Sequence, residues 1–192
     1  MIVSPGAFVR VGILVLLAVV LQLSALSQIE ILGGHLDLVV LVVAAVAYYA
    51  GSVSGSATGF AAGFLLDLLS GATMGASSLV LTAVGYGVGR FREVRDPSHG
   101  LMPVPVAAAA TASWLTAFAA VSLMLDIGAS VSPLVIRDMV VTTVLNALVA
   151  LPVFTGCRKL LRPSLARDPL EVRRRRRPPR ETGPIGLRGL EV

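Results

Sequence analysis

Residues 51–75 read GSVSGSATGFAAGFLLDLLSGATMG, and this stretch decides how the chain folds. Glycines stand at positions 51, 55, 59 and 63, Asp67 interrupts the series, and glycines resume at positions 71 and 75. A spacing of four places successive residues on nearly one face of a helix. In lipid, small residues on such a face let helix backbones approach closely, and this packing replaces the hydrophobic effect as the driving force. The stretch predicts a membrane helix from about Ser52 to Leu69 that is central and enclosed by its neighbours.

Close packing within a bundle is our interpretation of this face, and an interface with another protein is the alternative. The structural and interaction candidates taken from the whole sequence are Gly55, Gly59, Phe60, Gly63, Asp67, Gly71, Gly75, Arg137 and Asn146.

The composition of the whole chain indicates that lipid is its solvent. The 192 residues are 55% hydrophobic and 14% charged, and the mean hydropathy is +0.84. A soluble domain averages roughly 25% charged residues. Because so apolar a chain cannot cover a globular surface with polar side chains, we predict an all-α fold, a polytopic membrane helix bundle.

Six stretches are candidates for spans of the roughly 20 apolar residues that a bilayer requires. Besides the glycine-rich one, they run from about Phe8 to Ser27, from after His35 to about Ala50, from Ala76 to Gly89, from Val104 to Leu125 and from Pro133 to Phe154. Residues 1–157 are therefore interpreted as a transmembrane domain, and residues 158–192 as a separate tail.

The placement of Lys and Arg predicts the orientation of the spans. With the N-terminus inside, Arg10, the arginines at 90, 92 and 95, and the whole tail are cytoplasmic. This orientation places fifteen of the sixteen basic residues inside and leaves Arg137 outside. The alternative is a signal peptide cleaved after residue 27, which would leave five spans and an N-terminus outside.

The tail is rich in proline and arginine. Residues 158–192 carry eleven basic and four acidic residues, for a net charge of +7, whereas residues 1–157 carry −2. Such a segment is expected to be mostly disordered. We interpret its basic run as a topology anchor, with docking on anionic lipid headgroups as the alternative, at about 1 kcal/mol per arginine. That run is Arg173, Arg174, Arg175, Arg176 and Arg177. No nucleic-acid partner is expected, since no aromatic residues are interleaved with the charges.

Asp67 is an ionisable residue within an apolar span, and its position there needs an explanation. It is expected near the outer end of its helix, where a carboxylate faces the negative end of the helix dipole. Since Arg137 is the only basic residue expected outside, we hypothesise an Asp67–Arg137 ion pair. Asp37 and Asp138 are competing partners for Arg137. The alternative for Asp67 is an interfacial carboxylate that caps the turn at 70–71.

The sequence offers no catalytic or metal-binding constellation. Its two histidines, His35 and His99, are expected in loops on opposite sides of the membrane, and a single cysteine excludes an internal disulfide. We therefore expect no enzyme activity, no metal and no cofactor. Asn146 is expected to hydrogen-bond to another helix as structural glue. Pro152 is expected to kink the same helix.

The run from Gly59 to Gly75 resembles the signature of the rod shape-determining protein MreD family, which reads approximately G-F-x-x-G-L-x-x-D followed by a small-residue turn ending in Gly. Gly59, Phe60, Gly63 and Asp67 match that motif. The likeness covers about residues 8–162. Phe64 stands where the family usually has Leu, and Leu36 where it often has Pro, which puts the turn geometry before the second span in doubt.

The resemblance implies a non-catalytic membrane scaffold of the bacterial cell-elongation machinery, located in the inner membrane. Members of the family associate with MreC, and through it with MreB filaments and with RodA and its penicillin-binding-protein synthase, to organise lateral peptidoglycan synthesis and maintain rod shape. The fold implied is similar to that of energy-coupling-factor transporter substrate-binding subunits.

A small-molecule-binding subunit of an energy-coupling-factor type transporter is the alternative function, since six spans suit it equally. Such subunits usually carry an Ala-x-x-x-Ala patch on the first helix, which is absent here. A third interpretation, a channel or proton-linked transporter that uses Asp67, would need a charged path across the membrane.

Overall fold

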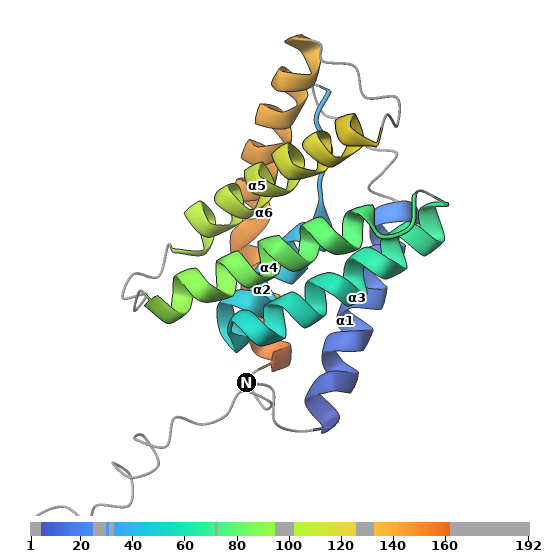
Figure 1. Ribbon diagram of the computed structural model, residues 1–192. Helices are drawn as coiled ribbons and strands as arrows, with labels where there is room; N and C mark the ends of the chain where they lie inside the picture. Colours follow the sequence, from blue (N-terminus) through green and yellow to red (C-terminus); the bar gives the residue numbers. More distant parts are fainter. Residues whose placement is uncertain are drawn as a thin grey trace, which may run out of the picture.

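The computed structural model describes residues 5–24, 30, 33–71, 73–94, 102–125 and 133–161, and within them the chain forms six helices. They are α1 (Pro5–Ser24), α2 (Leu38–Ala50), α3 (Ser52–Ser70), α4 (Ala76–Val94), α5 (Pro103–Met124) and α6 (Pro133–Leu161). In Figure 1 the starts of α1, α3 and α5 and the ends of α2, α4 and α6 lie toward the lower or left side. The direction of the chain thus alternates from helix to helix, and the structure is the polytopic membrane helix bundle that the sequence predicts.

The helices differ in their capacity to cross a membrane. Within the described residues, α3, α5 and α6 are long and apolar enough to do so by length and composition. The apolar part of α1 (Phe8–Ser24) and all of α2 are shorter. Charged side chains occupy the last turns of α4, at Arg90, Arg92 and Glu93.

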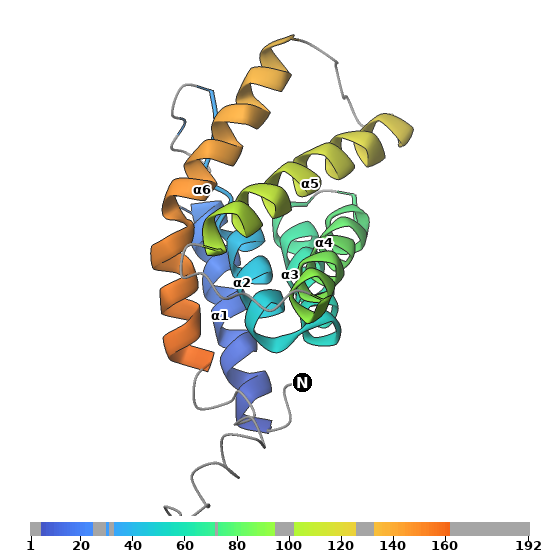
Figure 2. The same ribbon diagram turned by 90° about the vertical axis from the view of Figure 1, so that its left-hand side faces the viewer.

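The centre of the bundle is α2, and the prediction that the glycine-rich helix would be central is wrong. Eleven of the thirteen residues of α2 are buried, and α2 contacts all five other helices. A helix that is apolar all round is a buried helix, and α2 reads LVVLVVAAVAYYA. By contrast α3 buries one face only, because Phe60, Phe64 and Leu68 face outward. In Figure 2, α2 lies among α1, α3, α5 and α6.

Because α2 has only 13 residues, it rises about 20 Å, less than the roughly 30 Å of a hydrocarbon core. It is continued by a non-helical segment, residues 34–37, which packs against α6. A Cβ added at Gly34 would lie 2.7 Å from Val141 Cγ1 and 2.8 Å from the Thr142 nitrogen. Only a residue without a side chain fits at position 34, and the segment thereby lies close enough to α6 to bond with it.

Two helices run further than the sequence predicts. α4 continues to Val94 rather than Gly89, and α6 continues to Leu161 rather than Phe154, with Pro152 inside it. The basic residues Arg158 and Lys159 lie in the last turn of α6, where their positive charges interact favourably with the negative end of the helix dipole. The rest of the tail, with the run 173–177, lies outside the described residues.

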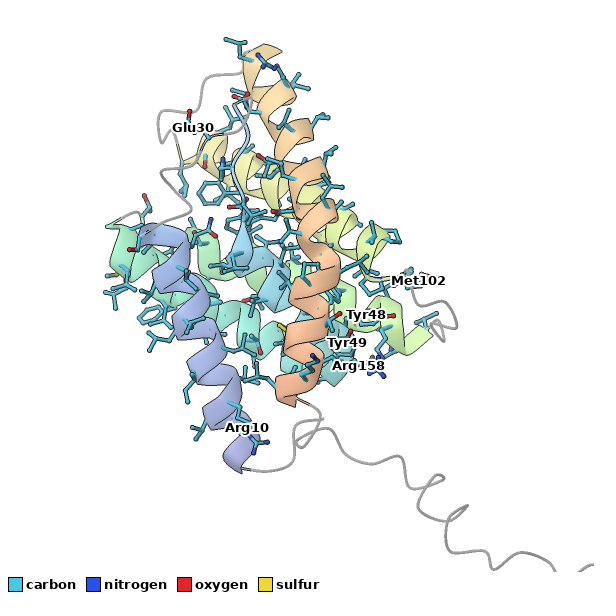
Figure 3. All side chains as sticks on the ribbon, turned by 180° about the vertical axis from the view of Figure 1, so that it is seen from behind. Arg10, Glu30, Tyr48, Tyr49, Met102 and Arg158 are labelled. Carbon is cyan, nitrogen blue, oxygen red and sulfur yellow. The ribbon has the colours of Figure 1, made fainter. Side chains whose placement is uncertain are left out.

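Aromatic and basic side chains gather at one end of the bundle. The rings of Tyr48 and Tyr49 at the end of α2 contact Phe154 of α6, with centroids 5.8 and 6.2 Å away. Figure 3 shows Tyr49 beside Arg158, with Arg10 at the same end of the bundle and Glu30 toward the opposite end. Arg92 of α4 also reaches this end, where its Nη1 donates a hydrogen bond of 2.9 Å to the Tyr49 carbonyl.

Candidate functional site

The glycine series of α3 packs directly on the backbone of α4. A Cβ added at Gly55 would lie 2.5 Å from the Gly85 carbonyl oxygen, one at Gly59 would overlap Leu81, and one at Gly63 would overlap the backbone of Ser78. Each of these positions requires glycine because the backbone of α4 occupies the space of a side chain. The close packing expected within the bundle is therefore present, and the series contacts α4 at all three positions and Ala47 of α2 at Gly55.

The glycines of α4 contribute to the same contact, which the sequence reasoning missed. A Cβ at Gly85 would overlap the Gly55 carbonyl, and one at Gly89 would overlap Ser52. Their spacing of four repeats the α3 pattern and was the available signal. Gly87, between them, faces away from α3, and a Cβ there would meet open space.

Asp67 fastens the α3–α4 turn. The side chain is 1% exposed, and its Oδ2 accepts a hydrogen bond of 2.8 Å from the Gly75 N–H, while Oδ1 accepts one of 3.3 Å from the Ser77 N–H. These donors belong to the turn before α4 and to the first turn of that helix. A carboxylate at a helix N-terminus is stabilised by the free N–H groups and by the helix dipole. Asp67 thus caps the start of α4 rather than the turn at 70–71.

The hypothesised Asp67–Arg137 ion pair is wrong. Asp67 takes part neither in the Arg90–Glu93 ion pair nor in the His35–Asp37 contact, which is an ion pair when His35 is protonated. Arg137 is exposed on α6, and both oxygens of Asp67 are engaged by backbone N–H groups instead. The pair is predicted because both residues are expected on the outer side of the membrane, but the local turn supplies Asp67 with donors only eight and ten residues away.

Gly71 and Gly75 shape the same turn through their backbones. Their φ angles are +66° and +99°, in the left-handed region that side chains disfavour, and a Cβ at either would meet open space. The four-residue spacing therefore has two physical origins. Positions 55, 59 and 63 need glycine for close approach, and positions 71 and 75 need it for conformation.

The opposite end of the hairpin is fastened by Glu93. Its Oε1 accepts hydrogen bonds from the Ser52 backbone N–H, at 2.9 Å, and from the Ser52 hydroxyl, at 2.8 Å. Ser52 begins α3, so a carboxylate near the end of α4 caps the start of α3. Carboxylates thus fix both ends of the α3–α4 pair, with glycine contacts between them.

Phe60 is the motif residue that faces outward. It is 57% exposed, and its ring stacks on Phe64 with centroids 6.4 Å apart. Across the hairpin, Met74 and Leu79 of the turn and α4 are each 66% exposed. A shallow pocket of about 530 Å³ lies between these four side chains. We name the set formed by Phe60, Phe64, Leu68, Met74, Leu79 and Tyr86 the hairpin outer face.

A second arrangement, a buried polar cluster, joins α1, α5 and α6 to the segment before α2. Asn146 of α6 accepts a hydrogen bond of 3.0 Å from the Asp37 N–H and donates one of 3.0 Å to Thr111 of α5. Gln22 of α1 donates to Asp37 Oδ1 at 2.8 Å and accepts from the Leu38 N–H at 2.7 Å. Asn146 therefore makes the cross-helix bond that the sequence predicts.

This cluster supplies the backbone partners that the non-helical segment needs. At membrane depth, irregular backbone is tolerated only where protein or water satisfies its polar groups. Here the N–H groups of residues 35, 37 and 38 donate to side chains of Thr142, Asn146 and Gln22. Sequence reasoning did not identify Gln22, Thr111 or Thr142, although Gln22 was visible as a polar residue in an apolar run.

Replacing Asn146 with leucine is expected to lower the free energy of unfolding by about 1–3 kcal/mol. The change orphans the buried Asp37 N–H and Thr111 hydroxyl, at about 1–2 kcal/mol per cross-helix bond in model systems. The measurement is an SDS titration of unfolding in mixed micelles. Thr155→Val in the same helix is the control, because its exposed hydroxyl bonds only within α6. An equal loss in both variants would show that the cluster contributes nothing.

The described residues contain no group of three His, Cys, Asp or Glu side chains placed to hold a metal ion. The polar side chains of both arrangements bond mainly to backbone and to one another. Among the described residues, Asp37 Oδ2 and Ser78 Oγ are buried without a hydrogen-bond partner. What the α3–α4 hairpin presents outward is an apolar, aromatic surface.

Comparison with known proteins matches residues 4–163 to the family described as rod shape-determining protein MreD. The match includes all six helices. No curated protein and no solved structure matches the chain.

Proposed function

This chain belongs to the rod shape-determining protein MreD family, and from that premise we propose that it acts as a non-catalytic scaffold that binds an MreC-like membrane protein. Rod shape determination in a membrane is the role that the family carries. The finer role proposed is stoichiometric binding that organises lateral peptidoglycan synthesis, with MreB filaments and the RodA and penicillin-binding-protein synthase reached through the partner. The family match over the whole helical part of the chain is the observation that carries this proposal.

The orientation proposed has the N-terminus and the tail in the cytoplasm of a bacterial cell, with the helices in its inner membrane. Two features support it. Arg92 and Arg158 both lie close to Tyr49, and Arg10 lies at the same end of the bundle (Figure 3). Clustering of basic residues on one side is typical of the cytoplasmic side of a membrane protein. The arginines at 173–177 continue this pattern in sequence, and we propose that they contact anionic headgroups.

The hairpin outer face is the surface proposed for the partner. The buried members of the motif, Gly59, Gly63 and Asp67, hold α3 on α4 and cannot touch another protein. Phe60 is the motif member that a partner can reach, and aromatic residues are enriched where interfaces form. The shallow pocket beside it offers a place for one inserted apolar side chain. The motif thus combines a rigid support with an exposed contact residue.

The test is a pull-down of the tagged full-length protein from detergent-solubilised native membranes, with partners identified by mass spectrometry. Wild type is expected to recover an MreC-like protein and wall synthases. Phe60→Ala with Phe64→Ala is expected to lower that recovery about tenfold, the loss that corresponds to about 1.4 kcal/mol. The control is Val144→Ala with Leu148→Ala, since these exposed apolar residues lie four apart on α6.

Each outcome of this pull-down has a distinct meaning. Equal recovery by the phenylalanine variant and wild type would remove the hairpin outer face as the contact and leave the scaffold role standing. Recovery of a transporter membrane subunit with its ATPases, in place of wall synthases, would overturn the scaffold role and identify a small-molecule-capture subunit.

A further inference from the structure

An apolar groove runs between α4 and α5, away from the α3–α4 contact. Its volume is about 700 Å³, and Ser113 is the one polar side chain among the thirteen residues that line it. The hollow exists because small residues stand where large ones would fill it, chiefly Ala83 and Gly87 on α4 and Ala109 on α5. These three residues are exposed, so the groove opens sideways to the surroundings of the bundle.

The length of the groove is close to the thickness of one lipid leaflet. On α4 the lining residues run from Val80 to Phe91, about 16 Å at 1.5 Å per residue, and on α5 from Pro105 to Ala117, about 18 Å. One leaflet is half of the roughly 30 Å hydrocarbon core, or about 15 Å. Measured along the helices, the groove is therefore about as long as one leaflet is thick, and about half as long as the span of a transmembrane helix of a partner.

The end of the groove near the end of α4 and the start of α5 carries positive charge. Phe91 and Met102 lie at that end, and Arg90 follows Gly87 by three residues, so it extends from the same side of α4. The Arg90 side chain is 61% exposed and lies 3.4 Å from Glu93. Among the described residues, Arg90, Arg92 and Glu93 give the last turns of α4 a net charge of +1. The dipoles of the α4 end and the α5 start oppose one another, so the arginines set its sign.

We propose that this groove binds an acyl chain of an anionic phospholipid from the leaflet at the Arg90 end, with the phosphate beside Arg90. The small lining residues admit the chain, the one-leaflet length selects a lipid over a helix, and the arginine selects a negative headgroup. In the orientation proposed above this is the cytoplasmic leaflet. The assignment stands independently of the partner protein and of the hairpin outer face.

The test uses Trp114, the single tryptophan of the chain, as a built-in reporter. Trp114 lies on α5 between the lining residues Ala110 and Ala117 and is 6% exposed, so bulk lipid reaches it poorly. The full-length protein is placed in phosphatidylcholine vesicles with a minor fraction of phosphatidylglycerol, and either lipid is brominated on its acyl chains. At equal mole fraction, brominated phosphatidylglycerol is expected to quench Trp114 more strongly.

Two variants distinguish the contribution of the lipid's acyl chain to binding from that of its headgroup. Gly87→Leu fills the groove without a backbone clash and is expected to abolish the preferential quenching, whereas Gly12→Leu, at an equally open position on α1, leaves it unchanged. Arg90→Gln is expected to lower the preference for phosphatidylglycerol about fivefold, the effect of one arginine near an anionic surface.

Equal quenching by both lipids in wild type would overturn the anionic assignment. Unchanged preferential quenching in Gly87→Leu would overturn the groove as the site. If Gly87→Leu instead loses the MreC-like partner in the pull-down while quenching stays as in wild type, the groove is a helix-docking surface and the lipid proposal is wrong. Because the phenylalanine variant tests the partner separately, failure of either proposal is distinguishable from failure of the other.

Discussion

Gly63→Leu is expected to destabilise the bundle by about 3 kcal/mol or more, at the upper end of what overpacking costs in a close-packed interior. Even a Cβ at Gly63 would overlap the backbone of Ser77 and Ser78, and backbone cannot move aside as a flexible side chain can. The two helices would have to separate, and the contacts of Gly55 and Gly59 would be lost with those of Gly63. The expected readout is a lower midpoint in an SDS titration of unfolding and a smaller monodisperse fraction after extraction.

The control for this prediction is Gly87→Leu, which introduces the same side chain into α4. A Cβ at Gly87 meets no atom within 4 Å, so no clash is expected. Replacement of a helical glycine by leucine should instead raise stability by up to about 1 kcal/mol through helix propensity. Similar losses in the two variants would mean that leucine destabilises this hairpin wherever it is placed, and that the contact with α4 does not govern position 63.

Asp67→Ala is expected to cost about 3 kcal/mol, because each of two hydrogen bonds to a charged group contributes about 1.5–3 kcal/mol. The change leaves the N–H groups of Gly75 and Ser77 without their acceptor at the start of α4. Asp67→Asn is expected to cost roughly half as much, since the amide keeps one acceptor oxygen. Unfolding titrations of the three proteins measure these differences.

A double-mutant cycle with Arg137 distinguishes the observed cap from an ion pair. Since Asp67 bonds to backbone, Arg137→Ala should be nearly neutral, and its effect should add to that of Asp67→Ala within about 0.5 kcal/mol. A coupling well above that value would restore the ion pair and contradict the cap. In the pull-down, Asp67→Ala should also weaken recovery of the partner, because the turn that positions Met74 and Leu79 would loosen.

Much of the architecture was predictable from the sequence because lipid imposes strong rules. The apolar composition requires helices, the lengths of the apolar runs give their number, and Asn146 in an apolar run requires a cross-helix partner. The four-residue glycine spacing marked one close-packed face. The family resemblance rested on the same residues, and the match over residues 4–163 confirms it.

Predictions failed where they depended on which elements meet. The sequence pairs Asp67 with Arg137 because both are expected on the outer side of the membrane, whereas the structure supplies its donors from the N–H groups of Gly75 and Ser77. The glycine-rich helix was expected at the centre, although the fully apolar α2 takes that place. Residue spacing along the chain could correct neither error. Spacing shows which face of a helix is packed, but it does not show which other helix or turn packs against that face.

By itself, therefore, the sequence determined that the chain lies in lipid, that it forms six helices, that one helix has a close-packed glycine face, and which family it belongs to. Each of these depends on composition or on spacing within one segment. Only the tertiary structure decided that Gly85 and Gly89 complete the contact, that Gln22 and Thr142 satisfy the segment before α2, and that Gly87 leaves a groove against α5. These features join residues that are far apart along the chain or distinguish neighbours on one helix. Their pairing depends on how all six helices pack at once, and local spacing carries no record of it.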